Sequence, residues 1–535
     1  MLPSISFLAD WKGACKEPTM RKPKLIYYND ARHYLMYRYD PPLSRHVLQQ
    51  PVDEILGTGV DTLSFGLASG ATFLHDTRVG KRWGEGVTDH NHGIMWWRAA
   101  KNLERALADG LDPLQVVIDR AHEKDIQIVC SLRINEGGTG SGMNANRYMF
   151  SRLKEEHPEY MIGDDAADPG RSTCLNFAIP EVRQERLAVI EEVCDRYGAD
   201  GIEIDDYVRT FFRQSEIEKN TPLLTEFMGD VRALLDRIGE RRGERLMLAA
   251  RAHPREDANL SVGMDVRSWM RERFVDLVVV DYGGFQFDQD TDHAWIAEEA
   301  RKSGALVYSH LGRTPYDDRH HDPTIEMYRA AASNHVAAGA DGIYLSSLDW
   351  PHTEREYLAM RELSDPDIYA RKNKHYVKAQ QESNPYALDR DLPIVLEEDV
   401  TATVPINVSD DVDCARADNE LERATLRVRI VQTGMEDKLT FKFNGAQLIL
   451  EPRNISHFYG GLVSYGIARA GFPERINTHY WFEFDIPVES VRRGENTVEV
   501  IPDHILTERV EDRVLLHAEL LLDYKQPPVP IGEQL

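Results

Sequence analysis

Three carboxylic acids stand within four positions in the stretch GADGIEIDDYVR, residues 198–209. The apolar segment 201–205 has the composition of a buried β-strand. Because side chains alternate along a strand, Glu203 and Asp205 are expected to share one face, with Asp206 as the first loop residue. Carboxylates buried together push their pKa values apart, as general acid–base catalysis requires. We therefore predict catalytic roles for all three. The alternative is that Asp205 and Asp206 cap or bridge loops.

Arg133 and Asn135 end another apolar segment, 126–134, and by the same alternation share one face. The planar fork of Arg133 suits carboxylates, so it is predicted to bind an acidic ligand such as an acidic sugar. The alternative is that Arg133 pairs with Glu203 or Asp205 and fixes their ionisation. Asp30 directly follows the segment 24–29 and is either catalytic or a loop cap.

Other polar and aromatic side chains follow predicted strands and are candidates for ligand binding. They are Tyr207, Arg251, His253, Asp281, His310, Asp349 and Trp350. Each one alone is more often a local hydrogen-bond partner than a functional group. Trp83, Trp96 and Trp97 are expected in loops, where they could stack on a ligand, whereas Trp269 and Trp295 are expected in the core. The histidines of His90-Asn91-His92 and His320-His321 lack metal-ligand spacing on strands, so we predict no metal and no cofactor.

Eight short apolar segments alternate with amphipathic ones. They are 24–29, 61–67, 126–134, 201–205, 245–251, 276–282, 305–310 and 342–348. Near-continuous apolar character is typical of parallel strands that are buried on both faces. Helix starts are predicted at Asp112-Pro113, Pro180 and Pro323. This alternation predicts an α/β fold, a (β/α)8 TIM barrel, with its site at the C-terminal ends of the strands. The long insertions 68–111, 135–175 and 311–322 follow strands and therefore belong to that face.

The pattern changes near residue 396 to alternating apolar and polar residues separated by turns such as Asn-Gly. The predicted strands are 424–431, 438–445, 479–486, 496–501 and 514–524. They indicate a C-terminal antiparallel β-sandwich. We therefore expect an N-terminal lead-in at 1–23, a catalytic barrel at 24–380 and an accessory β-sandwich domain at 393–535.

Composition excludes several classes of function. The net charge is -26, which disfavours nucleic-acid binding and a polybasic membrane surface. Five scattered cysteines form neither a disulfide framework nor a zinc motif. No signal peptide or membrane span is evident, so we expect a soluble cytoplasmic protein, although a sequence lacking its signal would look the same. The β-sandwich could support homo-oligomer formation.

The segment DGIEIDD, 200–206, resembles the fourth strand of many barrel glycosidases, and in the α-amylase superfamily the nucleophile occupies the position of Asp205. Further pieces resemble bacterial glycosyl hydrolase-like barrels: YYND (27–30), SLRIN (131–135), GMDVRSWM (263–270) and DPDIYARKNKHY (365–376). The resemblance covers roughly residues 24–380 and implies a carbohydrate substrate.

A family of inverting barrel sialidases is also distantly similar, because it has an Asp ending strand one and Arg-x-Asn ending strand three. Asp30 and Arg133-Ile134-Asn135 match those motifs. A catalytic His follows the second motif in that family. Glu136 stands there instead, which puts sialidase activity in doubt and makes Glu136 a candidate base.

Three interpretations remain open from the sequence. The first is a glycoside hydrolase in which Asp205 pairs with Asp30, Glu136, Asp206 or Asp349 across the scissile bond. The second is a carbohydrate-binding barrel without catalysis, and the third is a metal-dependent hydrolase or a lyase on the same fold. The carboxylate cluster favours the first, since the barrel itself hosts many chemistries.

Overall fold

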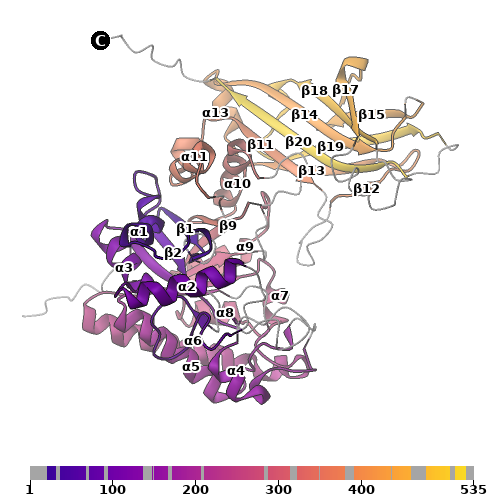
Figure 1. Ribbon diagram of the computed structural model, residues 1–535. Coiled ribbons are helices and arrows are strands. Elements are labelled where there is room, and N and C mark those ends of the chain that lie inside the picture. The colour runs from indigo at the N-terminus through magenta and orange to yellow at the C-terminus, as the bar shows by residue number, and fades with distance from the viewer. Residues whose placement is uncertain are drawn as a thin grey trace, which may run out of the picture.

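A computed structural model of the chain describes residues 21–31, 36–67, 72–88, 94–135, 148, 150–166, 171–205, 210–281, 287–313, 322–346, 348, 350–379, 391–434, 436–459, 478–506 and 512–525. The polypeptide forms a barrel with surrounding helices, followed by a β-rich part (Figure 1).

Eight parallel strands close into a barrel in the order β1-β10-β9-β8-β7-β6-β5-β2. They are β1 (Leu25–Asn29), β2 (Thr62–Gly66), β5 (Gln127–Arg133), β6 (Gly201–Asp205), β7 (Met247–Ala252), β8 (Leu277–Val280), β9 (Leu306–Leu311) and β10 (Gly342–Ser346). Apart from their ends, these strands coincide with the eight segments predicted from apolar composition. The predicted TIM barrel is therefore confirmed.

Two sets of apolar side chains hold this barrel together. One set fills the interior and consists of Ile26, Tyr28, Val129, Met247, Ala249, Leu277, Val279, Tyr308 and Tyr344. The other set points outward and packs against the helices in one large core. Since both faces are buried, the strands have little room for polar residues. The carboxylates of β6 are therefore exceptions that need partners.

The register of β6 sets the heights of its two acidic side chains. Ser131 of β5 lies beside Glu203, and Arg133 lies beside Asp205. The strand begins at Gly201, where a Cβ atom would stand 2.3 Å from the Met247 carbonyl oxygen of β7. Only glycine permits this close approach of the two strands. Glu203 is thus one step deeper in the barrel than Asp205.

Helices cover the outside of the barrel (Figure 1). They are α1 (Arg45–Asp53), α2 (Ile94–Ala108), α3 (Pro113–Glu123), α4 (Arg152–Glu156), α5 (Pro180–Glu191), α6 (Ile217–Arg242), α7 (Glu256–Leu260), α8 (Val266–Arg271), α9 (Ala294–Ser303), α10 (Ile325–Ala337), α11 (Glu354–Glu362) and α12 (Pro366–Tyr369). The Asp112 side chain caps α3 by accepting from the Leu114 N–H, and α5 begins at Pro180, both as predicted. Thr324 caps α10, so that helix begins just after Pro323.

The insertion after β2 is more ordered than its sequence suggested. It contains a small ribbon of β3 (Thr72–Phe73) and β4 (Lys81–Arg82), followed by α2. Trp96 and Trp97 were expected in a loop but lie in the first turn of α2. Trp83 is 2% exposed and packs on Trp96 and Tyr148, so its ring belongs to the core. Trp269 is buried in the core as predicted.

The C-terminal part consists of two antiparallel sheets that share one apolar core. One sheet has the order β11-β20-β14-β18-β17, with β12 also paired to β20, and the other has the order β13-β19-β15-β16. The strands are β11 (Lys374–Ala379), β12 (Ile394–Val395), β13 (Ala402–Val408), β14 (Leu421–Val431), β15 (Lys438–Phe443), β16 (Ala446–Leu448), β17 (Ile455–Tyr459), β18 (Thr478–Ile486), β19 (Gly494–His504) and β20 (Val514–Tyr524). Within the described residues this part has one short α-helix, α13 (Val412–Ala417), so the predicted antiparallel fold is confirmed.

β11 was not predicted as a strand. It lies inside the range 24–380 assigned to the barrel, yet it pairs along its length with β20 of the C-terminal sheet. The charged composition of Lys374–Ala379 hides it from a search for apolar runs. The domain limits drawn from the sequence remain a prediction, but this strand belongs to the sheet and not to the barrel.

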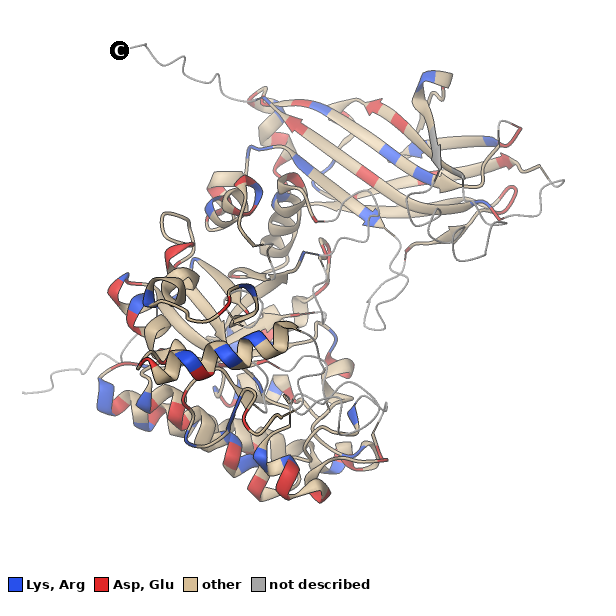
Figure 2. Ribbon diagram, in the orientation of Figure 1, with Lys and Arg blue, Asp and Glu red and all other residues tan. Residues whose placement is uncertain are grey.

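Charged residues of both signs are interspersed over the barrel helices and the sheet strands (Figure 2). Among the helices that are described, none combines the length and the apolar character needed to cross a bilayer.

A buried ion pair fastens β11 to the C-terminal part. The Lys374 ammonium lies 2.9 Å from the Asp410 carboxylate, and both side chains are almost fully buried. Tyr376 and Tyr524 donate hydrogen bonds of 3.0 and 2.6 Å to the same carboxylate. Burial lowers the pKa of Lys374, although Asp410 acts in the opposite direction. The ammonium therefore depends on this one buried counter-charge.

We predict that Asp410→Asn lowers the free energy of unfolding by about 3 kcal/mol, because it leaves a buried ammonium without its counter-charge. Backbone carbonyls still accept from Lys374 and keep the loss near the lower end of the usual range. Urea unfolding followed by tryptophan fluorescence measures it. Asp413→Asn, at an exposed ion pair, is the control and should change little. Equal effects in the two variants would contradict the assignment.

Candidate functional site

Glu203 lies one step deeper in the barrel than Asp205, and 2% of its side chain is exposed. Its carboxylate accepts hydrogen bonds from Ser64 (3.0 Å), Ser131 (3.0 Å), Tyr344 (3.1 Å) and the Arg251 Nε (2.8 Å). These donors come from β2, β5, β10 and β7. A carboxylate with this many donors is already committed to them. Glu203 therefore joins strands from around the ring, and it is not the side chain best placed for chemistry.

Arg251 supplies the compensating positive charge. Besides Glu203, it donates to Asp281 (3.1 Å) and to the Tyr344 hydroxyl (2.7 Å). Its guanidinium also lies 4.7 Å from the ring centre of Tyr28 and 5.0 Å from that of Tyr344. Burial alone would lower its pKa, but the surrounding acidic groups raise it well above the usual value. Arg251 was predicted to bind ligand, yet the structure places it beneath the site as a buried cation.

Asp205 ends β6 with 1% of its side chain exposed, and it is less well satisfied than Glu203. The Ser131 hydroxyl, which donates its proton to Glu203, lies 3.4 Å from Oδ2, and the Nε atoms of Arg133 and Arg251 lie 3.8 and 3.6 Å from the carboxylate. Oδ1 accepts no hydrogen bond from any residue that the structure describes. Burial raises the pKa of Asp205, although the two arginines act in the opposite direction. These are the properties of a group that can hold a proton and release it.

Asp30 and Arg133 form an ion pair beside Asp205. The Arg133 Nη2 donates to Asp30 Oδ2 at 2.8 Å, and the same guanidinium faces Asp205 through Nε. The sequence offered two partners for Arg133, Glu203 or Asp205. The structure has the Asp205 pairing, at 3.8 Å, and adds a hydrogen bond to Asp30 at the end of β1, which the sequence did not suggest. One planar cation therefore stands between two carboxylates that the sequence places more than a hundred residues apart.

His310 of β9 closes the other side of this group. Its Nε2 hydrogen-bonds the Ser346 hydroxyl, and its Nδ1 lies 3.5 Å from Asp281 Oδ1. Burial lowers the pKa of His310, which favours a neutral imidazole near neutral pH. A neutral ring adds no positive charge next to Asp281. His310 and Asp281 thus lie with Asp205 in one continuous polar group inside the barrel.

Three predicted ligand-binding residues have other tasks in the described structure. Asn135 uses both amide N–H groups on the Leu175 and Thr210 carbonyls and accepts from the Leu175 N–H. The His253 ring accepts from the Arg255 N–H at 3.0 Å. Trp350 donates from its indole to Glu54 at 2.9 Å and lies under the Arg38 guanidinium. Asn135 in particular links the segments around Leu175 and Thr210, and these backbone partners occupy the amide groups that a ligand would otherwise bind.

Four predicted site residues, Glu136, Asp206, Tyr207 and Asp349, lie outside the described residues, as do the histidines at 90, 92, 320 and 321. Within the described ranges, no three His, Cys, Asp or Glu side chains are grouped so as to hold a metal ion.

Sequence reasoning missed Tyr28, Ser64, Ser131 and Tyr344. Each was hidden in an apolar strand and looked like a packing residue. The available signal was the alternation itself: Ser64 on β2 and Ser131 on β5 fall on the inward face of their strands, as Glu203 does. Two hydroxyls facing into an otherwise apolar barrel indicate a buried acceptor.

A family model and several curated proteins match part of the chain. Residues 79–221 match the family model described as glycosyl hydrolase-like 10. This range contains β5 and β6, and therefore Arg133, Glu203 and Asp205. Over 186 residues the chain is 24% identical to "Glycosyl hydrolase DigH" of Escherichia coli (strain K12), and equally to the protein of that name from Shigella flexneri. The match covers 34% of this chain and spans 39% of the length of those relatives.

Solved structures of carbohydrate-active enzymes are distantly similar. They include a cycloisomaltooligosaccharide glucanotransferase of Paenibacillus sp. (11% identity, TM-score 0.31, 93% of this chain and 57% of that chain). A family 18 N-acetylglucosaminidase of Paenibacillus barengoltzii gives 13% identity and a TM-score of 0.36 over 64% of this chain and 99% of that chain. An alpha-L-fucosidase of Paenibacillus thiaminolyticus gives 13% and 0.39 over 65% and 48%. Nothing about the site follows from likenesses at these scores.

The different surroundings of the two β6 carboxylates lead to opposite effects on stability. We predict that Asp205→Asn raises the free energy of unfolding at neutral pH by about 1 kcal/mol, because it removes a buried charge whose ionisation opposes folding. Glu203→Gln should lower it by about 3 kcal/mol, because Arg251 loses its counter-charge. Chemical unfolding of the three proteins measures both.

The stability advantage of Asp205→Asn over the wild type should depend on pH. The pKa of Asp205 is raised in the folded state, so the wild type gains stability as the pH falls through that folded value toward the usual aspartate range. The advantage of Asp205→Asn should therefore shrink at acid pH. An advantage that stays constant with pH would contradict the assigned cause.

Proposed function

We propose that this chain is a glycoside hydrolase whose reaction takes place at the C-terminal end of the barrel, with Asp205 as proton donor. The supporting observation is the contrast on β6. Glu203 is held by four donors, whereas Asp205 has a raised pKa and an oxygen that accepts no hydrogen bond among the described residues. The match of residues 79–221 to a glycosyl hydrolase-like family supports the choice of a carbohydrate substrate.

In this proposal the Asp205 proton passes to the glycosidic oxygen as the bond from that oxygen to the anomeric carbon breaks. Asp30 is the partner carboxylate. It either takes a proton from a water that attacks the anomeric carbon or attacks that carbon itself, and water then completes hydrolysis. Arg133 lies between the two carboxylates and keeps them oriented. Arg251 and Glu203 support Asp205 from below without touching substrate.

The proposal predicts that Asp205→Asn loses at least about a thousandfold in kcat/KM, as expected when a proton donor to the transition state is removed. Release from a panel of neutral and acidic aryl glycosides, together with reducing-end assays on polysaccharides, measures it. Asp125→Asn is the matched control. Asp125 is exposed in the turn between α3 and β5, so this variant should keep full activity. Unchanged activity in Asp205→Asn would remove this residue from the mechanism. Wild-type activity should fall as rising pH deprotonates Asp205.

The Asp30–Arg133 pair also bears on the charge of the sugar. Arg133 already has a carboxylate partner at 2.8 Å, and Asp205 and Asp281 lie nearby, so a ligand carboxylate gains little by entering. We expect neutral glycosides to be preferred over uronides and sialosides. This differs from the expectation, drawn from the sequence, that Arg133 recognises an acidic sugar.

Asp30→Asn tests this preference. The substitution removes the counter-charge of Arg133, so affinity for glucuronate should rise by about tenfold, equivalent to one charge-assisted hydrogen bond. Calorimetric titration with glucuronate and glucose compares the wild type and the variant without requiring turnover. Tight binding of glucuronate by the wild type would overturn the neutral-sugar assignment.

A further inference from the structure

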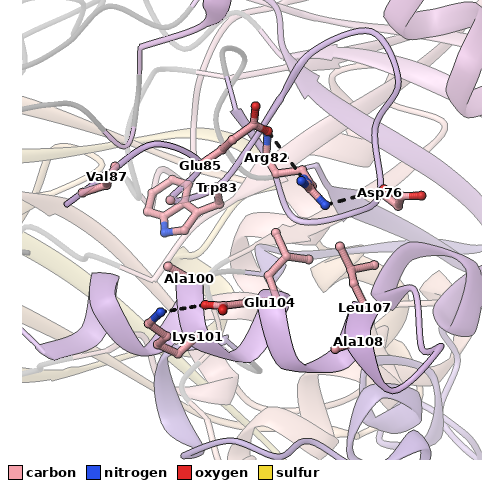
Figure 3. Close-up of a pocket in the computed structure, with 12 residues that line it drawn as sticks. Asp76, Arg82, Trp83, Glu85, Val87, Ala100, Lys101, Glu104, Leu107 and Ala108 are labelled. Atoms are coloured by element: carbon pink, nitrogen blue, oxygen red, sulfur yellow. Dashed lines mark hydrogen bonds and ion pairs between the residues drawn. The ribbon is translucent and has the colours of Figure 1, made fainter.

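A cavity of about 510 Å³ lies between the segment around β4 and one face of α2 (Figure 3). Its aliphatic wall is formed by Val87, Ala100, Leu103, Leu107 and Ala108. Gly84, at φ +82°, brings the chain so close to α2 that a Cβ there would lie 2.4 Å from the Ala100 Cβ. This volume is within the usual range for small-ligand pockets.

Charged side chains of both signs line the rest of the cavity. Arg82 lies 3.9 Å from Asp76 and 3.5 Å from Glu85, while Lys101 pairs with Glu104 at 2.6 Å (Figure 3). The two Arg82 contacts are longer than good hydrogen bonds, and its side chain is 46% exposed. Arg82 and the Oδ1 atom of Asp76 therefore keep hydrogen-bonding capacity for a ligand, whereas Asp76 Oδ2 accepts from Arg196 at 3.4 Å. Arg196 and Arg152 also pair with Asp76 and Glu85, so the charges around the cavity are compensated and give no strong field for an ionic ligand.

Trp97 extends the same face of α2 by one turn. It stands four residues before Lys101 and seven before Glu104, which is the spacing of side chains on one side of a helix. Its side chain is half-buried and lies outside the packed apolar core. Within the part of the chain that the structure describes, its indole has no hydrogen bond and no ring contact, unlike those of Trp83 and Trp96. Ile94 and Met95 beside it are more than half exposed.

We propose that this cavity together with Trp97 is a second glycan-binding site, which takes neutral pyranose units. A pyranose has apolar C–H faces that stack on an indole, and hydroxyl groups that bridge carboxylates and guanidinium groups. The cavity offers both kinds of partner. An anion would meet three carboxylates, and a purely apolar ligand would leave the charged wall poorly solvated.

The site is attached to the framework of the barrel mouth. On another side of α2, Arg98 donates to the Tyr37 carbonyl at 2.7 Å and Asn102 donates to the Tyr39 carbonyl at 2.6 Å. These carbonyls belong to the segment that follows β1 and Asp30. The helix is therefore fixed to that segment. A glycan bound on α2 would then have a fixed position relative to the segment that follows Asp30. The inference rests on the proposed function only for the choice of a glycan as ligand.

Binding in the Asp205→Asn background tests this site apart from catalysis. The probe is an array of immobilised neutral oligosaccharides, followed by calorimetric titration of a soluble oligosaccharide that binds. We expect Trp97→Ala to weaken binding by at least about tenfold, the equivalent of one lost stacking contact. Trp97→Phe should retain most of the affinity because it keeps an aromatic face. Arg82→Ala should also weaken binding, whereas Arg423→Ala, an exposed arginine of the C-terminal sheet, should not.

Trp97 lies outside the packed apolar core and Arg82 is 46% exposed, so these variants should stay close to the wild-type thermal unfolding temperature. Equal binding by Trp97→Ala and the parent protein would overturn the proposal, as would the absence of binding to every neutral glycan on the array. If the wild type hydrolyses no glycoside but Trp97-dependent binding persists, the proposed function fails and this site remains.

Discussion

The ion pair between Arg251 and Glu203 lies in the interior of the barrel, where side chains from opposite sides of the ring of strands meet. Burying either charge alone would cost several kcal/mol, and the pair is tolerated because each member is also hydrogen-bonded to further groups. Ser64, Ser131 and Tyr344 complete the shell of Glu203, while Asp281 and Tyr344 complete that of Arg251. The closed arrangement of the strands and the positions of these side chains therefore depend on one another.

The Arg251–Glu203 pair also determines how many hydrogen-bond donors are left for Asp205. Arg251 has one guanidinium, and its Nε donates to Glu203 at 2.8 Å but approaches Asp205 only to 3.6 Å. Asp205 thus receives electrostatic help without a full set of donors. Burial can then raise its pKa, which is the state that proton donation needs. Glu203 and Asp205, two residues apart on β6, therefore differ in their hydrogen bonding because Glu203 accepts from most of the nearby donors.

The sequence was sufficient for the barrel, because apolar runs buried on both faces are a local signal. It also indicated correctly that Glu203 and Asp205 share a face, since alternation follows from backbone geometry alone. The sequence was not sufficient to identify the ion-pair partners of the site residues. Pairing Arg133 with Asp30, or Arg251 with Glu203, requires the strand order and register, which are set by long-range packing. The strand β11 was missed for a related reason: its charged residues are stabilised by β20 and Asp410, which follow it at a distance along the chain.

The pairing of β11 with β20 has a consequence for how the chain can be divided. A chain cut near residue 380, where composition suggests a boundary, would end in a strand whose partner had been removed. Such a strand exposes a row of backbone N–H and C=O groups and invites pairing with other molecules. The complementary fragment would expose the matching edge of β20. The two parts can therefore be separated without exposing an unpaired strand edge only before Lys374, which assigns α12, the last described helix before β11, to the barrel side.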